Sequence, residues 1–392
     1  MKKISIFYIL VALAFFFYAC EEIEKRPLFS DSKAPQPIMF PVVINESGGA
    51  TIYYNLPDET DLLYVKAVYT LGNGKQYETR SSIYLSSIKV EGYGDTLEHS
   101  VTLYTVDRSE NVSEPVEVTI QPEIPDVHLV YESIEMVPDF GGVQFTWKNP
   151  NNAPLSFLIL ASDSTGTPYT IDVVYSSIVD GQYILRGFDP VESTFGIIVR
   201  DRWDNLSDSL NMAVTPMYEE KLDKEKFNRI VLPGDTDMDA WGQRYEWMYD
   251  DDLKTMSHSY AGTGWPQYFT LDLGVVAKLS RFKLYQRLDN SAFAYGHGNP
   301  RLLEVWGTDE EPVADGSWEG WTKLRDCMAS RPTEEGGTAE EDQAHYQNGD
   351  EYSFKLDDPP VRYIRILVNE TWGLTGFIHI GEVTFYGQVI SE

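Results

Sequence analysis

Apolar and polar residues alternate in short runs along much of the chain. Residues 101–106 (Val-Thr-Leu-Tyr-Thr-Val) show the alternation clearly, and residues 63–69, 157–161 and 195–199 are further apolar-rich runs of strand length. A period of two is typical of a β-strand with one buried face. Short strands that are separated by turn signals about every 8–12 residues predict β-sandwiches.

The first half of the chain repeats itself. Three landmarks recur in the same order at offsets of 93 to 95 residues, which is hard to obtain by chance. This spacing predicts two copies of one sandwich module, at residues 34–121 and 125–215. The matched pairs are residues 48–57 with 141–150, Gly92-Tyr93 with Gly187-Phe188, and residues 107–113 with 201–207.

The third landmark has the pattern Asp-Arg-x-(Glu/Asp)-Asn. Its acidic and amide residues are Asp107 and Asn111 in the first copy, and Asp201 and Asn205 in the second. Asp and Asn side chains bond to their own backbone and tolerate left-handed dihedrals, so the pattern is typical of a turn between strands. A functional site formed by these four residues is the alternative to this structural interpretation.

Residues 230–389 have no copy upstream, and they hold most of the tryptophans. Helical periodicity is minimal there, so we expect an all-β jelly-roll sandwich of about eight strands. The highly charged residues 217–229 are expected to be a linker, with a short helical stretch, that leads into this domain. The strand candidates are residues 268–274, 279–285, 302–307, 352–356, 361–368 and 382–387.

Composition narrows the function. The chain has 392 residues, enough for two to four domains, and a formal net charge of −30. Nucleic acid is excluded as a partner because phosphates require a basic surface. Two cysteines provide no disulfide framework and no Cys-rich zinc site, and Cys327 is expected to be a lone buried thiol. Common catalytic motifs are missing and no carboxylate pair stands out from the surface charge, so we expect no enzyme.

The N-terminus has the parts of a secretory signal. Lys2 and Lys3 precede an apolar run at residues 4–18, and Ala19-Cys20 follows. The end of this run resembles a bacterial lipobox, although Phe17 stands where that family prefers Leu. The resemblance implies a signal peptide at residues 1–19 and a lipid on Cys20. An N-terminal membrane helix is the alternative, although the run is short for a span.

An acidic segment, residues 20–33, follows the cysteine as a linker. Glu21, Glu22 and Glu24 resemble the signal that sends Bacteroidetes lipoproteins to the outer face of the outer membrane. The resemblance implies a lipid-anchored protein that faces the cell exterior. A merely solvated linker is the alternative.

The two modules resemble fibronectin type III domains, as well as the paired N-terminal modules of surface lipoproteins from gut Bacteroidetes. The last segment, residues 217–392, resembles the discoidin domain (coagulation-factor type C), which has the galactose-binding-like fold of many carbohydrate-binding modules. Five motifs in the family's order carry this second resemblance: residues 269–274 (Phe-Thr-Leu-Asp-Leu-Gly), 279–282, 303–308 (Leu-Glu-Val-Trp-Gly-Thr), 361–366 and 381–387 (Gly-Glu-Val-Thr-Phe-Tyr-Gly).

The discoidin resemblance implies a structural calcium ion. The family's calcium loop matches Asp250, Asp252 and Thr255, and Glu382 before the last strand completes the set. Calcium takes six to eight hard oxygen ligands, which clustered Asp side chains and loop carbonyls supply. Asp251 departs from the family pattern, where Gly is usual. A solvated acidic turn is the alternative.

Ligands of the discoidin family bind in loops at one end of the sandwich. An aromatic plane lies under the apolar face of a sugar, and Arg, Asn or His side chains orient its hydroxyl groups. Core packing or loop bracing is the alternative role for each candidate. The carbohydrate-binding candidates are Arg287, Tyr295, His297, Asn299, Trp372 and Trp265.

We therefore expect a non-catalytic, cell-surface glycan-binding lipoprotein, accessory to polysaccharide capture and uptake. The expected partners are a polysaccharide or oligosaccharide, the outer membrane through the lipid anchor, and an outer-membrane uptake complex. The alternative is an adhesion or protein–protein interaction lipoprotein that docks to a host protein or an outer-membrane complex. The sequence does not identify the glycan.

Overall fold

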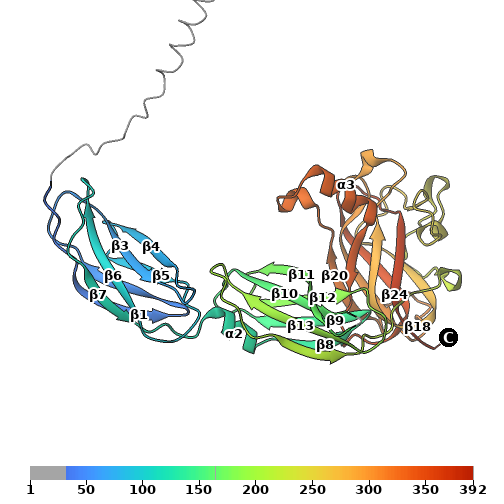
Figure 1. Cartoon of the computed structure of the whole chain (residues 1–392). Helices are drawn as coiled ribbons and strands as arrows, with labels where there is room; N and C mark the ends of the chain where they lie inside the picture. The colour runs from blue at the N-terminus through green and yellow to red at the C-terminus, as the bar shows by residue number, and fades with distance from the viewer. Residues whose placement is uncertain (1–31, 164, 392) are drawn as a thin grey trace, which may run out of the picture.

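A computed structural model describes residues 32–163 and 165–391 of the chain. The signal sequence and Cys20 lie outside the described residues. Nearly all regular structure is β, which confirms the all-β prediction. Figure 1 shows two sandwiches in succession and a larger third one that stands at the far end of the second. No helix in the described part of the chain is long and apolar enough to cross a membrane.

The first module packs a three-stranded sheet, β1-β2-β5, against a four-stranded sheet, β4-β3-β6-β7. Alternate residues face inward, so Ile52, Val65 and Leu103 are fully buried between the sheets. The strands are β1 (Met39–Glu46), β2 (Gly49–Asn55), β3 (Leu62–Thr70), β4 (Gln76–Ser82), β5 (Ser87–Glu91), β6 (His99–Asp107) and β7 (Val116–Ile120).

The second module repeats this topology strand for strand, with sheets β12-β9-β8 and β11-β10-β13-β14. Phe145, Phe157 and Ile197 are buried in its core, and the two modules are fibronectin type III-like as predicted. A helix that the alternation did not predict, α2 (Asp126–Glu132), connects the modules. The strands are β8 (Glu135–Asp139), β9 (Gly142–Lys148), β10 (Leu155–Ser162), β11 (Pro168–Ser176), β12 (Asp180–Arg186), β13 (Ser193–Arg200) and β14 (Leu210–Val214).

The repeated Asp-to-Asn landmark forms a closed turn in both modules. One Asp107 oxygen accepts the N–H of Asn111 at 2.9 Å, and the other accepts its side-chain amide, also at 2.9 Å. Asp201 and Asn205 make the same two bonds at 2.9 and 2.7 Å. These bonds satisfy turn backbone and side-chain groups, so they account for the residue types without a ligand.

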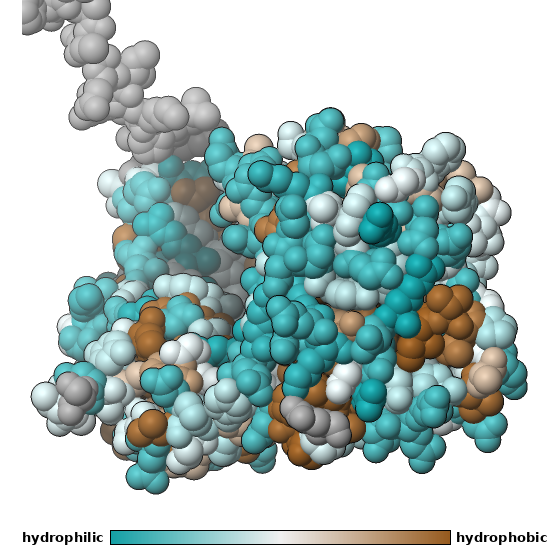
Figure 2. Space-filling view, turned by 90° about the vertical axis from the view of Figure 1, so that its right-hand side faces the viewer, coloured by the Kyte–Doolittle hydropathy of each residue, from teal (hydrophilic) through white to brown (hydrophobic). Residues whose placement is uncertain are grey.

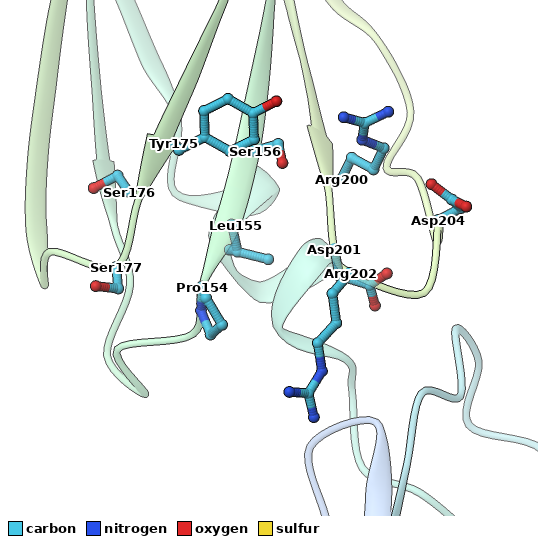
Figure 3. Close-up of a pocket in the computed structure, with 10 residues that line it drawn as sticks. All are labelled: Pro154, Leu155, Ser156, Tyr175, Ser176, Ser177, Arg200, Asp201, Arg202 and Asp204. Atoms are coloured by element: carbon cyan, nitrogen blue, oxygen red, sulfur yellow. The ribbon is translucent and has the colours of Figure 1, made fainter. Parts of the chain in front are cut away.

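The second copy of this turn docks on the first module. Trp203 packs against the hydrophobic core of the first module, and a Cβ atom on Gly92 would lie 2.8 Å from its ring. The Asn205 amide donates to the Gly92 carbonyl at 3.0 Å, and Arg202 pairs with Glu91 at 2.6 Å. Figure 3 shows Arg202 extending from the turn toward the first module. The same turn lines a hollow of about 590 Å³.

Charged contacts join the second module, and the linker that follows it, to the terminal sandwich. Glu219 accepts from the Arg281 guanidinium at 3.0 and 3.1 Å and from the Ser280 hydroxyl at 2.5 Å. Arg186 lies 3.6 Å from Glu351 across the same joint. The Arg281 and Glu219 side chains are only 15% and 14% exposed, so this pair contributes more than a fully solvated one.

The terminal domain is a jelly-roll-type sandwich, as predicted. Its main sheet has the order β15-β24-β18-β22-β19-β20, and β16 and β21 also pair with β18. The strands are β15 (Glu220–Lys221), β16 (Asn228–Ile230), β17 (Ser257–His258), β18 (Gln267–Tyr285), β19 (Pro300–Thr308), β20 (Thr322–Met328), β21 (Asp350–Ser353), β22 (Val361–Thr371), β23 (His379–Ile380) and β24 (Glu382–Ser391).

Strand β18 carries the chain from one layer of the sandwich to the other. Its first residues pair with β22 and its last residues with β24, and the two parts meet at a bend at Gly274, where φ is 71°. The sequence predicted two separate strands at 268–274 and 279–285. The structure joins them because the backbone stays extended on both sides of the bend.

The sequence also missed one helix of the terminal domain. Helix α3 (Ala339–Asn348) begins with a capping box, in which Thr338 accepts the Glu341 N–H and Glu341 accepts the Thr338 N–H. Thr-x-x-Glu at residues 338–341 was the signal available in the sequence. The short 3₁₀ helices are η1 (Lys224–Lys226), η2 (Ala240–Gly242), η3 (Tyr245–Met248), η4 (Ser291–Phe293) and η5 (Pro332–Glu335).

The core of the terminal sandwich contains Phe269, Phe282, Ile366 and Phe385, all nearly inaccessible. Cys327 belongs to the same core as a free, buried thiol, as the cysteine count predicted. Burial raises the pKa of this thiol to about 12, so it stays protonated and unreactive at neutral pH. Figure 2 shows mostly hydrophilic side chains on one face of the molecule, with a few compact hydrophobic patches.

Candidate ligand-binding surface

Three connections of the terminal sandwich meet at one end of its sheets, which we call the loop end. They are residues 259–266, 286–299 and 372–378. The starts of β18 and β19 both lie beside the end of β22, since Gln267 pairs with Val368 and Pro300 with Thr371. Backbone hydrogen bonds join the loops: Gly262 to Gly376 at 3.1 Å, Gly373 to His297 at 2.8 Å and Trp372 to Asn299 at 2.9 Å.

Two of the predicted ligand residues, Tyr295 and Trp372, contact each other. Their rings meet edge to face with centroids 5.3 Å apart. The Arg331 guanidinium lies 4.9 Å from the Tyr295 ring centroid, and that of Arg301 lies 4.6 Å from the Trp372 ring. The Tyr295 hydroxyl lies 3.1 Å from Nδ1 of His345 on α3. Both rings are therefore half-buried and held by their neighbours.

Arg287 and His297 flank the same loop. The Arg287 guanidinium forms two contacts of 2.5 and 2.7 Å with Asp289 and lies 4.0 Å from the Phe293 ring centroid. His297 is exposed, and its ring lies perpendicular to that of Phe293, with the ring centroids 4.5 Å apart. His297 therefore presents a polar edge to solvent, whereas Arg287 is largely engaged within the loop.

Asn299 braces the loop from below. Its side chain is fully buried, its oxygen accepts the Arg287 N–H at 2.9 Å, and its amide donates to the Phe293 carbonyl at 2.7 Å. These bonds close residues 287–299 into a compact loop. The geometry gives Asn299 a positioning role, and a ligand at the surface does not reach its amide in this arrangement.

The most exposed aromatic rings at this end are ones that the sequence did not single out. Trp241 is 72% exposed and Tyr260 is 49% exposed, and their ring centroids lie 6.3 Å apart. Trp265, a predicted ligand residue, is 42% exposed at the end of the same loop as Tyr260. The available signal for Trp241 was its place between Ala240 and Gly242, which offer it little to pack on.

The segment that carries Trp241 is well anchored. Asp239 accepts the Tyr245 N–H at 2.7 Å and pairs with Arg229 at 2.5 Å. Asp239 also forms a parallel bridge with His258, which places Trp241 beside the start of the Tyr260 loop. Burial opposes ionisation of the Asp239 carboxyl, but these hydrogen bonds and the arginine charge outweigh it and lower its pKa. Trp241 therefore projects from a fixed base.

Left-handed backbone conformations gather at the loop end. Trp241, Tyr295, His297 and Leu374 have φ values of 61°, 49°, 51° and 51°. Bulky residues rarely adopt positive φ, because the Cβ atom approaches the backbone. Each such residue costs about 1–3 kcal/mol, and such strain clusters at sites that bind ligands. This concentration points to the loop end as the functional surface of the domain.

A buried histidine supports the loops from inside. His379 is fully buried, and its Nε2 accepts the Gly298 N–H at 3.2 Å. Burial, followed by electrostatic repulsion from the His258 and Arg287 side chains, lowers the pKa of His379 to about 3. The imidazole is therefore neutral at physiological pH, which its acceptor role requires.

The predicted calcium ligands fall into two groups. Thr255 Oγ1 lies 3.0 Å from both Asp250 oxygens, and the Asp252 carboxylate accepts the Lys254 N–H at 3.0 Å. Glu382 is 1% exposed and lies 2.5 Å from the Lys224 ammonium instead. Burial raises the pKa of Glu382 to about 7, and Lys224 opposes the rise.

These residues do not fit a calcium shell in this arrangement. Within the described ranges, 32–163 and 165–391, no three His, Cys, Asp or Glu side chains are grouped to hold a metal ion. The ammonium of Lys224 already lies at Oε1 of Glu382 and supplies a positive charge there. Calcium binding by Asp250, Asp252, Thr255 and Glu382 stays a prediction of the sequence.

The fold and the loop end define a class: a multidomain all-β protein with two tandem modules and a terminal sandwich that exposes aromatic side chains at one end. A SusE-like protein, BT2857, is 35% identical to the chain over 68% of the chain and all of its own length, with a TM-score of 0.45. The chain belongs to the SusE-like proteins.

Three family models also match, each described as a domain of unknown function: DUF4959 at residues 35–122, DUF5126 at 123–225 and DUF5000 at 245–387.

Two other solved structures are more distant. The C-terminal domain of a chitobiase from Bacteroides fragilis is 14% identical, covering 44% of this chain and all of that chain (TM-score 0.32). A two-domain fibronectin type III segment of chicken tenascin is also 14% identical, covering 46% of this chain and 99% of that chain (TM-score 0.24). No protein of curated function matches the chain.

Proposed function

We propose that this protein is a non-catalytic, cell-surface glycan-binding lipoprotein that assists polysaccharide capture and uptake. Its terminal sandwich binds the carbohydrate at the loop end. The two modules act as a stalk between this surface and a lipid on Cys20 at the outer face of the outer membrane. Membership of the SusE-like proteins and the lipobox-like N-terminus support this assignment.

One observation carries the proposal: Trp241 and Tyr260 are exposed side by side on an anchored segment of the loop end. Large aromatic rings normally lose water contact on folding, so an exposed pair on a fixed base is available to a partner. The apolar face of a pyranose ring has the shape and chemistry to cover one of these two rings, whose planes are inclined to each other by 46°. The net charge of −30 favours neutral glycans over acidic ones, because like charges repel.

The candidates from the sequence take different roles in this proposal. Trp265 extends the exposed aromatic surface, and His297 offers a polar edge to sugar hydroxyl groups. Tyr295 and Trp372 support the surface from the second layer of side chains, with Arg287 and Asn299 holding the loop between them. The backbone bond between Gly262 and Gly376 joins the Tyr260 loop to the segment beside His297.

Affinity electrophoresis of the chain from Glu21 onward, in gels that contain single polysaccharides, tests the proposal. Retardation by at least one neutral glycan is expected, and Trp241→Ala should weaken it about 10-fold or more, because a stacked ring loses most of its buried apolar area. Tyr84→Ala is the matched control, since Tyr84 is an 89% exposed aromatic residue of the first module.

Two results would count against the proposal. Retardation that is equal in the wild type, Trp241→Ala and Trp265→Ala proteins would place the glycan elsewhere on the chain. Failure of every glycan, together with tight binding to an outer-membrane protein complex, would favour the docking alternative, in which the protein recognises another protein.

A further inference from the structure

A buried ion pair of the terminal domain comes from the linker. Lys224 lies in η1, and its side chain is only 5% exposed. Its ammonium lies 2.5 Å from Glu382 Oε1 and 2.7 Å from Asp251 Oδ1. Lys221 also reaches Asp251, at 2.6 Å, but its side chain is 44% exposed. The linker therefore places one solvated and one buried ammonium group on the same acidic region.

Glu382 needs a positive partner at this place. It is 1% exposed at the start of β24, and its second oxygen is buried without a hydrogen-bond partner among the described residues. A buried carboxylate without a counter-charge is strongly destabilising. Asp250 and Asp251 add negative charge nearby, which increases the requirement.

A divalent ion and the Lys224 ammonium exclude each other at Glu382. Both carry positive charge and both would lie at the single carboxylate of Glu382, where the ammonium already contacts Oε1, and their repulsion is strong at short range in a buried site. The loop oxygens are also engaged: Thr255 Oγ1 lies 2.7 Å from the Asp252 carbonyl and 3.0 Å from Asp250. Asp250 in turn accepts the Asp252 N–H at 2.9 Å.

We propose that the Lys224 ammonium replaces a metal ion as the structural cation of the terminal sandwich. The domain then folds and holds its shape without calcium, and the chain carries its own cation in the linker. This inference is independent of the glycan-binding proposal and stands against the calcium site that the sequence predicted.

Thermal unfolding of the chain from Glu21 onward, in excess calcium and in excess chelator, gives the first test. The unfolding midpoint is expected to be the same in both. In calorimetric titration with calcium, the wild type and Glu382→Gln should give the same heat. A midpoint that rises in calcium, with binding heat that Glu382→Gln abolishes, would overturn the inference in favour of a metal site.

Charge removal at the linker gives the second test. Lys224→Met should lower the midpoint of the terminal domain by on the order of 10 °C, because a buried carboxylate loses its partner. Lys221→Met is the matched control: it shares Asp251 but does not touch Glu382, and its solvated pair should shift the midpoint by only about 1–3 °C.

A double variant keeps the test decisive if Lys224→Met alone does not fold. When the ammonium serves to neutralise Glu382, Lys224→Met combined with Glu382→Gln should be more stable than Lys224→Met alone. Equal or additive losses in the double variant would show that Lys224 does not act as the counter-charge of Glu382, and would overturn the inference.

Discussion

His379 makes the stability of the loop end depend on pH. Its pKa in the folded protein is about 3, while an ordinary histidine in the unfolded chain titrates near pH 6.5. Between these values the unfolded chain binds a proton that the folded protein does not. The stabilising contribution of neutral His379 is therefore complete above about pH 6.5 and is lost as the pH falls toward 3.

We expect the free energy of unfolding to fall through this group by up to about 1.4 kcal/mol per pH unit below pH 6.5. His379→Gln, whose amide oxygen can still accept the Gly298 N–H, should flatten this part of the profile. His297→Gln is the control, because His297 is an exposed histidine of the loop that His379 supports. Chemical denaturation at pH 7, 6, 5 and 4 measures the slopes. Parallel profiles for wild type and His379→Gln would contradict the assignment.

The sequence predicted the exposure of some site residues but not of others. Trp265 and His297 were singled out for their loop context, and both are exposed in the structure. Asn299 was chosen for the same reason but is fully buried, because its amide matches two backbone groups of its own loop. The small neighbours of Trp241 were a weak signal of its exposure, but the contacts of Asp239 with Tyr245 and Arg229, which fix its segment, cannot be read from a local pattern.

At the scale of elements, alternation succeeds where the cause of structure is local. The inner strands of both modules, such as β2, β3 and β9, follow a period of two because one face is buried, and the repeated landmarks predicted the two copies. Alternation did not predict that β18 is one continuous strand. It depends on backbone geometry at Gly274, where two apolar runs that look separate continue through one bend.

Gly274 gives an element-scale prediction. With φ at 71°, a Cβ atom there would lie 2.3 Å from the Lys226 carbonyl oxygen. Gly274→Ala should cost about 2–4 kcal/mol of stability, since the clash with a backbone atom adds to the strain of left-handed Ala.

Gly320→Ala is the control for Gly274→Ala. Its φ is 78° in the same domain, and a Cβ atom there meets nothing within 4 Å. Only the conformational strain remains, so a loss of about 1 kcal/mol is expected. Urea unfolding of both variants separates the two contributions, and equal losses would show that no clash occurs at Gly274.

At the scale of the whole molecule, the joints decide how the three sandwiches act together. The two modules carry the same turn, but Trp203 in the second copy stands where the first has Ser109. This difference between copies was the sequence signal for the joint. The structure explains it: Trp203 leaves its own module and packs on the first.

Trp203→Ala should loosen this joint. The loss of a packed indole weakens such a contact by about 3 kcal/mol, so the modules should move independently and the interdomain distances should broaden in small-angle X-ray scattering. Ser109→Ala, at the matching position of the first copy, should leave the scattering curve unchanged. A curve for Trp203→Ala that superposes on the wild type would mean that Arg202 and Asn205 hold the joint without the ring.

The linker contact of Lys224 also sets the unit in which this sandwich can be moved between proteins. A gene segment that began at Tyr245, where the matched family model begins, would leave Glu382 buried without its ammonium partner. A segment that includes η1 carries its counter-charge with it. Recombination during evolution, like the grafting of this domain onto a new carrier, should therefore preserve a boundary ahead of Lys224.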